Sequence, residues 1–207
     1  HGRSFWSTAF NYALLAEDIH HYLTENKVEH ATVLGHSMGG KVAMLLACLH
    51  PGKVDQLIVA DIAPKTYPSH HQMILNGLAS LDFSVIKSRK EADDALAEFV
   101  KDAGTRQFLL KNIYRITPTQ LGLRLNVDVL KNVSEQIGET MGQELVYQGE
   151  TLFLKGVNSG YIENEDEVLI RHHFPKAKIV SIERAGHWLH AENPKDFAQA
   201  IENWWQL

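Results

Sequence analysis

The chain has 207 residues, of which 44% are apolar and 22% charged, as is ordinary for a soluble globular protein. The formal net charge of −5 and the absence of a basic block argue against a nucleic-acid partner. No apolar run approaches the length needed to span a bilayer, so we expect no membrane partner. The single cysteine, Cys48, excludes an internal disulfide and favours a reducing, cytoplasmic setting.

The first third of the chain predicts one strand–helix–strand unit preceded by a helix. Apolar residues at roughly helical spacing predict a helix over 11–26. The short apolar run 31–35 predicts a buried strand, the apolar stretch 38–50 predicts a helix that stops at Pro51-Gly52, and 56–60 predict a second strand. A strand, a helix and a strand in this order imply a parallel sheet.

The pattern then changes to helices. Residues 69–80, 91–102, 104–114 and 118–137 have helical character, and no convincing strand is found between Pro64 and Tyr147. Because a simple crossover is much shorter, we expect an inserted helical cap. Strand character returns at 151–155 and 178–182, with a helix near 164–173 between them and a last helix over 194–206, N-capped by Asn193.

These elements predict an α/β fold with a mostly parallel sheet, flanking helices and a cap. The expected division is a first core part (1–63), a helical cap (64–147) and a second core part (148–207). The aromatic and aliphatic residues of the cap could line an acyl pocket or form the cap's own core; they are Phe83, Phe99, Phe108, Leu109 and Tyr114.

Residues 35–39 read Gly-His-Ser-Met-Gly, a G-x-S-x-G motif. In this motif a strand turns sharply into a helix, and a serine hydroxyl is exposed on a strained backbone where bulky neighbours would clash. An apolar strand precedes the motif and an apolar helix follows it, which is the required context. We therefore predict that Ser37 is a nucleophile and that the Met38 N–H, at the helix start, stabilises an oxyanion.

A nucleophilic serine needs an imidazole within hydrogen-bonding reach. His187 follows the predicted strand 178–182 and comes directly after Gly186, so we predict that it is the base, with His190 as the alternative. The histidine pairs 20–21, 70–71 and 172–173 look like exposed helix residues. Neighbouring helix residues point about 100° apart, which makes a pair a poor metal clamp.

The carboxylate that should orient the imidazole is less obvious. In folds of this kind the acid most often lies in the loop after the strand that follows the cap, here 151–155. That loop contains Asn158 and Ser159 but no acid. Glu163, Glu165 and Asp166 come later and look like charges at the start of a helix. Asp61 ends the strand 56–60 at the sheet edge expected for Ser37, and a lone charge there needs a partner. We predict Asp61 as the acid; the alternative is that Asp61 caps the first helix of the cap.

Four segments together resemble small bacterial esterases of the YbfF type: Gly35-His36-Ser37-Met38-Gly39-Gly40-Lys41, Asp61-Ile62-Ala63-Pro64, Gly156-x-Asn158-Ser159-x-Tyr161 and Gly186-His187-Trp188-x-His190-x-Glu192. The resemblance covers essentially the whole chain and is weakest in the cap. It implies the α/β-hydrolase fold, a Ser–Asp–His triad with the acid on the earlier strand, small acyl-ester or acyl-thioester substrates, no cofactor or metal, and a pocket between core and cap.

The front end departs from this family, whose members begin with further strands and a His-Gly loop that supplies a second oxyanion N–H. His1-Gly2-Arg3-Ser4 is similar instead to a later His-Gly-x-Ser segment. Since the strand 31–35 is too apolar for a sheet edge, we expect an N-terminal segment of the same protein to complete the sheet of a monomer or homodimer.

Three readings of function follow. The first is a serine esterase that works through an acyl-enzyme. The second keeps the fold and changes the reaction to a lyase step, C–C bond hydrolysis or perhydrolysis, since fold does not fix function. The third is a non-catalytic ligand-binding protein, against which the presence of Ser37, Asp61 and His187 argues.

Overall fold

The computed structural model describes residues 4–67, 72–133 and 140–205. It divides the chain into two compact units, one of Tyr12–Tyr67 with Glu139–Leu207 and one of His1–Asn11 with Pro68–Gly138. We call the first the sheet unit and the second the helical unit. The expected boundaries at 63/64 and 147/148 remain predictions.

The sheet unit contains a parallel sheet with the strand order β1-β2-β5-β6. It comprises α1 (Tyr12–Glu25), β1 (Ala31–His36), α2 (Met38–Leu49), η1 (Pro51–Lys53), β2 (Val54–Ala60), β5 (Glu150–Gly156), α7 (Asp166–His173), β6 (Ala177–Ile182), α8 (Leu189–Glu192) and α9 (Pro194–Trp205). The predicted strands and helices of this part are confirmed to within two residues at most ends. The short helix α8 was not predicted.

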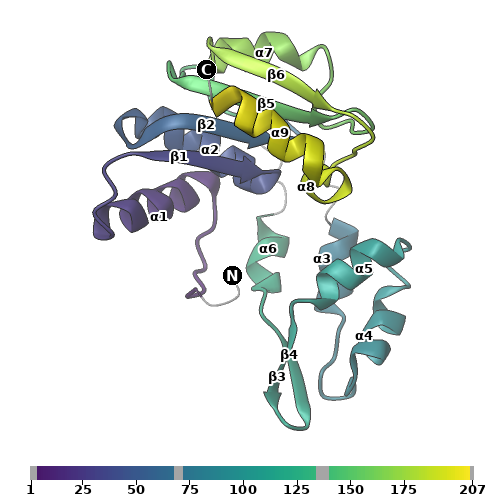
Figure 1. Cartoon of the computed structure of the whole chain (residues 1–207). Coiled ribbons are helices and arrows are strands. Elements are labelled where there is room, and N and C mark those ends of the chain that lie inside the picture. Colours follow the sequence, from purple (N-terminus) through teal and green to yellow (C-terminus); the bar gives the residue numbers. More distant parts are fainter. Residues whose placement is uncertain (1–3, 68–71, 134–139, 206–207) are drawn as a thin grey trace. The chain divides into compact units, whose positions relative to one another are not determined.

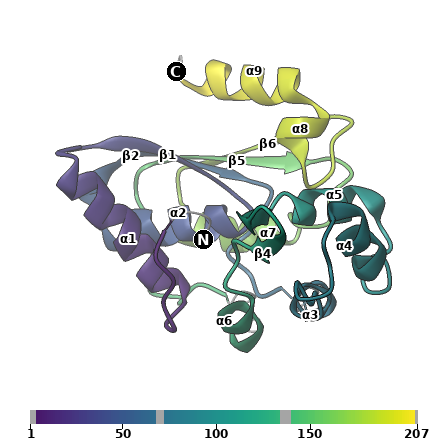
Figure 2. The same ribbon diagram turned by 90° about the horizontal axis from the view of Figure 1, so that it is seen from below.

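Helices cover both faces of this sheet. Figure 2 shows α1, α2 and α7 on one face and α9 on the other. Side chains of the central strand β2 alternate accordingly: Leu57 and Val59 join the cluster with α1, α2 and α7, whereas Ile58 packs with Trp204 of α9. Burial on both faces explains why β2 and β5 read as continuous apolar runs. The Asn193 side chain accepts the Asp196 N–H at 3.3 Å, which confirms the predicted N-cap of α9.

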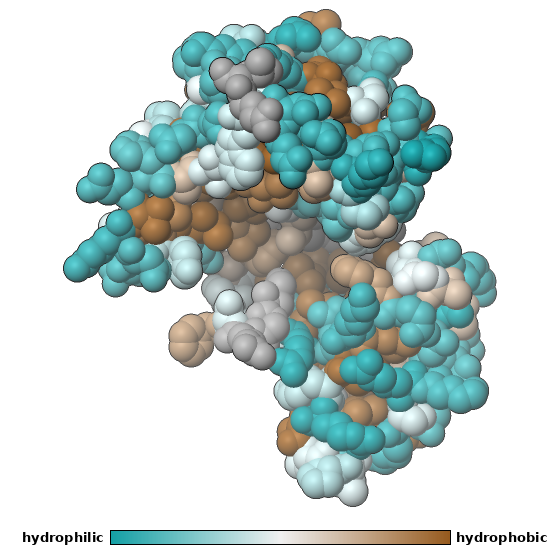
Figure 3. Space-filling model, viewed as in Figure 1, coloured by the Kyte–Doolittle hydropathy of each residue, from teal (hydrophilic) through white to brown (hydrophobic). Residues whose placement is uncertain are grey.

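The strand β1 corrects one expectation. Residues 31–35 were expected to form a buried strand, yet among the described residues β1 pairs only with β2 and stands at the end of the sheet (Figure 1). Only Gly35 is fully buried in it, and Leu34 is 47% exposed. Brown, apolar side chains gather along this edge in Figure 3. Val33 packs against the cluster that contains α2, whereas Leu34, which points to the other face of β1, is largely uncovered by the described residues.

The helical unit corrects a second expectation, since it contains an antiparallel hairpin. Its elements are α3 (Gln72–Ala79), α4 (Arg89–Leu96), α5 (Ala103–Leu110), β3 (Ile113–Thr117), β4 (Gln120–Leu123) and α6 (Val127–Asn132). The helix expected over 118–137 is therefore wrong for 118–126, and α6 is its only helical part among the described residues. The helix expected over 104–114 is wrong at its end, since α5 stops at Leu110 and β3 begins at Ile113. Pro118 and Thr119 form the hairpin turn, and β-branched residues precede them, so the segment suits strands better than a helix.

The five aromatic and aliphatic residues named for the cap divide within the helical unit. Leu109 belongs to its buried core, and Phe83 and Phe99 pack against that core. Phe108 is 47% exposed, and the Tyr114 ring faces the Arg124 guanidinium at 4.8 Å. The core interpretation thus holds for three of the five.

Some predictions fall outside the described residues: the His1-Gly2-Arg3 segment, the His70-His71 pair, and the parts of predicted helices at 69–71, 134–137 and 206. Among the helices that the structure describes, none is both long and apolar enough to traverse a lipid bilayer.

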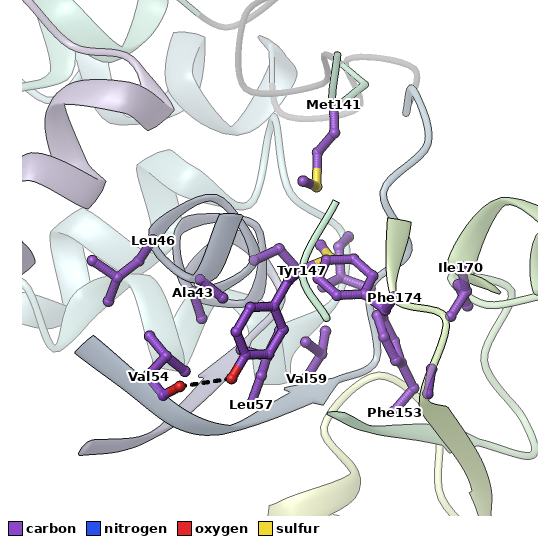
Figure 4. Close-up of a cluster of buried hydrophobic side chains, with 14 of the residues drawn as sticks. Ala43, Leu46, Val54, Leu57, Val59, Met141, Tyr147, Phe153, Ile170 and Phe174 are labelled. Carbon is purple, nitrogen blue, oxygen red and sulfur yellow. Dashed lines mark hydrogen bonds between the residues drawn. The ribbon is translucent and has the colours of Figure 1, made fainter. Parts of the chain in front are cut away.

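Tyr147 links the start of β2 to the main core of the sheet unit. Its ring is 2% exposed and lies among Leu57, Val59 and Phe174 (Figure 4), and its hydroxyl donates to the Val54 carbonyl at 2.7 Å. A buried carbonyl that loses its donor destabilises the fold.

We predict that Tyr147→Phe lowers the free energy of unfolding by about 1–2 kcal/mol, because the Val54 carbonyl stays buried without this donor. Urea unfolding followed by circular dichroism measures the change. Tyr22→Phe is the control, since Tyr22 is 62% exposed and should change stability little. Equal stability of Tyr147→Phe and the wild type would contradict the prediction.

Candidate functional site

Ser37 stands between β1 and α2 on a strained backbone. Its φ of 54° lies in the left-handed region that non-glycine residues rarely adopt. The turn is held by the Ser37 N–H, which donates to the Ala60 carbonyl at 3.0 Å, and by the Ser37 carbonyl, which accepts the Gly40 N–H at 2.8 Å. Such strain concentrates at functional sites and costs about 1–3 kcal/mol.

The glycines around Ser37 have different roles. A Cβ on Gly35 would lie 2.2 Å from the Gly39 carbonyl oxygen, and a Cβ on Gly40 would lie 2.5 Å from Ile62 Cγ2. A Cβ on Gly39 would meet no described atom within 4 Å. The expectation that glycine is sterically required therefore holds for Gly35 and is wrong for Gly39. Gly40, which lies outside the five-residue motif, is packed more tightly than Gly39.

The structure brings Ser37, His187 and Asp61 into one hydrogen-bonded chain within the sheet unit. His187 Nε2 lies 2.9 Å from Ser37 Oγ, and His187 Nδ1 lies 2.9 Å from Asp61 Oδ2. The His187 side chain is 20% exposed, and that of Asp61 is completely buried. Since a carboxylate only accepts, Nδ1 carries the proton and the lone pair of Nε2 faces the serine hydroxyl.

Asp61 is held from several sides. Its own φ is 50°, its N–H donates to the Leu154 carbonyl at 2.8 Å, and Oδ1 accepts the Gly156 N–H at 3.0 Å. Oδ2 also accepts a short hydrogen bond from the Ser159 hydroxyl. A fully buried carboxylate is tolerable only with such partners, and none of the described donors to the Asp61 carboxylate belongs to α3, the first helix of the helical unit.

The other predicted acids and bases lie elsewhere. Glu163 Oε2 is 3.5 Å from Lys65 Nζ, Asp166 Oδ2 is 2.6 Å from the same nitrogen, and Glu165 is the exposed N-cap residue of α7. His190 lies edge-on to the His36 ring, with centroids 4.7 Å apart. None of these side chains has a described contact with Ser37.

Met38 is the first residue of α2, and its side chain is 40% exposed. As the N1 residue its N–H has no intrahelical acceptor, and the helix dipole favours negative charge there. The role of the Met38 N–H as an oxyanion donor stays a prediction.

Three further residues support His187 and a fourth supports Asp61, and all four were missed as functional residues by residue-level reasoning. The Glu192 carboxylate accepts the N–H groups of Gly186 and Trp188, at 2.8 and 3.2 Å, and so braces the loop around His187. Tyr161 stacks on the imidazole with a centroid distance of 3.9 Å. His36 Nε2–H donates to the His187 carbonyl at 2.7 Å, and Ser159 holds Asp61. Only the family resemblance contained a signal for these positions.

The pKa of His36 is lowered, chiefly by burial; the hydrogen bond to the His187 carbonyl opposes this and raises it, and the charges of His187 and His190 lower it further. A neutral His36 keeps Nε2–H as the donor to the His187 carbonyl without adding a positive charge beside His187. Burial likewise raises the pKa of the Tyr161 phenol, which stays neutral on the face of the imidazole.

Comparison with known proteins gives a consistent picture. A family model described as "alpha/beta hydrolase fold" matches residues 1–194. The mouse protein named sn-1-specific diacylglycerol lipase ABHD11 is 37% identical, in a match that covers 97% of this chain and 67% of the mouse protein. Esterase YbfF of Escherichia coli K12 is 32% identical, in a match that covers 99% of this chain and 78% of YbfF.

Among solved structures, one titled "Marine microorganism esterase" superposes with a TM-score of 0.94 at 39% identity, covering 99% of this chain and 81% of that one. The chain spans about two thirds of the length of the ABHD11 proteins it matches.

We predict that Gly35→Ala lowers the free energy of unfolding by about 2–3 kcal/mol, because its Cβ would overlap the Gly39 carbonyl and the turn must open. Gly39→Ala, the matched control, should stay within about 0.5 kcal/mol of the wild type. Urea unfolding of both variants tests the pair. Equal losses for the two would show that the packing around Ser37 differs from this description.

Proposed function

Since the chain belongs to the α/β-hydrolase fold family, we propose that it is a serine esterase that hydrolyses small acyl esters or thioesters through a covalent acyl-enzyme. The relatives are named esterases and lipases, which supports a hydrolase. The observation that carries the proposal is the hydrogen-bonded chain from Ser37 Oγ through His187 to the buried Asp61 carboxylate.

In the first half-reaction, His187 Nε2 takes the Ser37 proton as Oγ attacks the acyl carbon. The Ser37–His187 distance of 2.9 Å supports this transfer, because proton abstraction requires hydrogen-bonding reach. The Met38 N–H donates to the developing oxyanion; removing one such donor typically costs about 10²–10³ in rate. His187 then gives its proton to the leaving alcohol or thiol.

In the second half-reaction, His187 Nε2 takes a proton from water, and the hydroxide attacks the acyl carbon of the acyl-enzyme. Collapse of the second tetrahedral intermediate breaks the bond to Oγ and releases the carboxylic acid. The proton on His187 returns to Ser37. No cofactor is required by this sequence of steps.

Asp61 orients the imidazole and stabilises the imidazolium that forms in both halves. Its burial strengthens the interaction, because a charge pair shielded from water is poorly screened. The Gly156 N–H and the Ser159 hydroxyl occupy other lone pairs of the carboxylate. One lone pair of Oδ2 therefore remains to accept the hydrogen bond from His187 Nδ1. We propose Ser159 as a positioning residue for Asp61.

We predict that Ser37→Ala, His187→Ala and Asp61→Asn each reduce kcat/KM for p-nitrophenyl acetate and butyrate by about 10³-fold or more, because the three side chains act as one unit. Labelling of the wild type, and not of Ser37→Ala, by a fluorophosphonate probe is expected in parallel. Glu163→Gln is the matched control and should retain near wild-type turnover, since Glu163 contacts Lys65 instead.

Loss of activity in Glu163→Gln together with an active Asp61→Asn would move the acid to the later loop. Labelling of Ser37 without ester turnover would favour a lyase, C–C hydrolase or perhydrolase reaction. A wild type that neither labels nor turns over esters would favour a ligand-binding protein.

A further inference from the structure

Away from Ser37, three side chains that could bind a metal ion lie close together. Glu17 and His20 of α1 meet His50, which follows α2, and one ligand atom from each residue lies within 4.8 Å of the others. The sequence showed only the His20-His21 pair, whose members point in different directions. His50 comes from another element, so only the fold assembles the three.

The three side chains are already close to a ligating arrangement. His50 Nε2 is 2.7 Å from Glu17 Oε1, and His20 Nδ1 is 3.7 Å from Glu17 Oε2. The two imidazole rings stack with centroids 3.7 Å apart and an interplanar angle of 10°, so one ring must turn for both nitrogens to face the same ion. Tetrahedral ligands at about 2.0–2.1 Å from a metal lie about 3.3 Å from one another. One atom from each of the three residues lies within 4.8 Å of the others, so the side chains must draw together to bind an ion.

The backbone that carries these ligands is fixed. Glu17 and His20 are three residues apart on α1 and therefore share a face. His50 is both the C-cap of α2 and the N-cap of η1: its N–H donates to the Leu46 carbonyl at 2.8 Å, and its carbonyl accepts the Lys53 N–H at 2.9 Å. Ala16, beside Glu17, is fully buried in the core between the helices.

The chemistry of the three ligands indicates which metal ion would bind. Two imidazole nitrogens and one carboxylate oxygen are ligands typical of Zn²⁺ with a fourth position open to water, whereas Mg²⁺ and Ca²⁺ prefer oxygen ligands throughout. The His20 and His50 side chains are 31% and 23% exposed, which leaves an entry path from solvent. We propose that Glu17, His20 and His50 form a Zn²⁺ site.

The site lies at the opposite end of α2 from Ser37. Twelve helical residues separate the two ends, which corresponds to about 18 Å. The ion therefore takes no part in the proposed ester hydrolysis. It joins α1 to α2, which pack side by side (Figure 1), and stabilises the folded state because the unfolded chain does not hold the three ligands together.

Zn²⁺ binding to the metal-free protein tests the proposal, measured by competition with a chromophoric chelator and by thermal unfolding. We expect one equivalent bound and, at a hundredfold excess over Kd, a rise in Tm of about 5–10 °C that EDTA reverses. His20→Ala, His50→Ala and the isosteric Glu17→Gln should each weaken binding by at least about 10-fold.

His21→Ala is the matched control, because His21 is the neighbour of His20 on α1 and lies outside the cluster; it should bind like the wild type. Glu17→Gln keeps the inference testable if a histidine variant fails to fold. Equal Zn²⁺ affinity in Glu17→Gln, His20→Ala and the wild type would overturn it. So would the absence of binding at about 100 µM Zn²⁺, which is about 100 times a micromolar Kd. Ester turnover plays no part in this test, so its outcome is separate from that of the proposed function.

Discussion

The buried carboxylate of Asp61 is the constraint around which the site of the sheet unit is arranged. A completely buried charge is stable only when its lone pairs are occupied, and here the three donors come from the ends of two other strands. Gly156 is the last residue of β5 and Ser159 follows it, whereas His187 follows β6. Satisfying Asp61 therefore brings the ends of β2, β5 and β6 to one point, beside the turn that presents Ser37.

Close backbone packing makes this convergence possible. Gly156 lets the chain after β5 pass the loop before His187, since a Cβ there would lie 2.2 Å from the Gly186 carbonyl oxygen. Gly35 does the same for the turn at Ser37. Glu192 then ties the His187 loop to the short helix α8 through two backbone N–H groups. The strained backbones of Ser37 and Asp61 persist because the surrounding hydrogen bonds over-determine them.

Where expectation and structure differ, long-range or cooperative effects are responsible. The hairpin β3–β4 was taken for helix because short apolar runs fit either period, and cross-strand pairing between residues such as Ile113 and Leu123 decides in favour of strands. The strand β1 was expected to be buried, yet among the described residues only Ala31 and Val33 of its apolar side chains pack on the core, and Leu34 is exposed. Gly39 was expected to be sterically required, but the clash that matters involves Gly35 and Gly40.

The elements of the sheet unit, the turn at Ser37 and the candidates Ser37, His187 and Asp61 could be named from the sequence because each belongs to a local pattern. A run of apolar residues, a glycine-flanked serine and a charge at the end of a strand are visible within a few neighbouring positions. The contacts of Ser159 and Glu192, the stacking of Tyr161 on His187 and the meeting of His20 with His50 needed the folded chain. Their partners are far apart in sequence or belong to different elements, and no local pattern encodes which side chains the packing of helices and strands brings together.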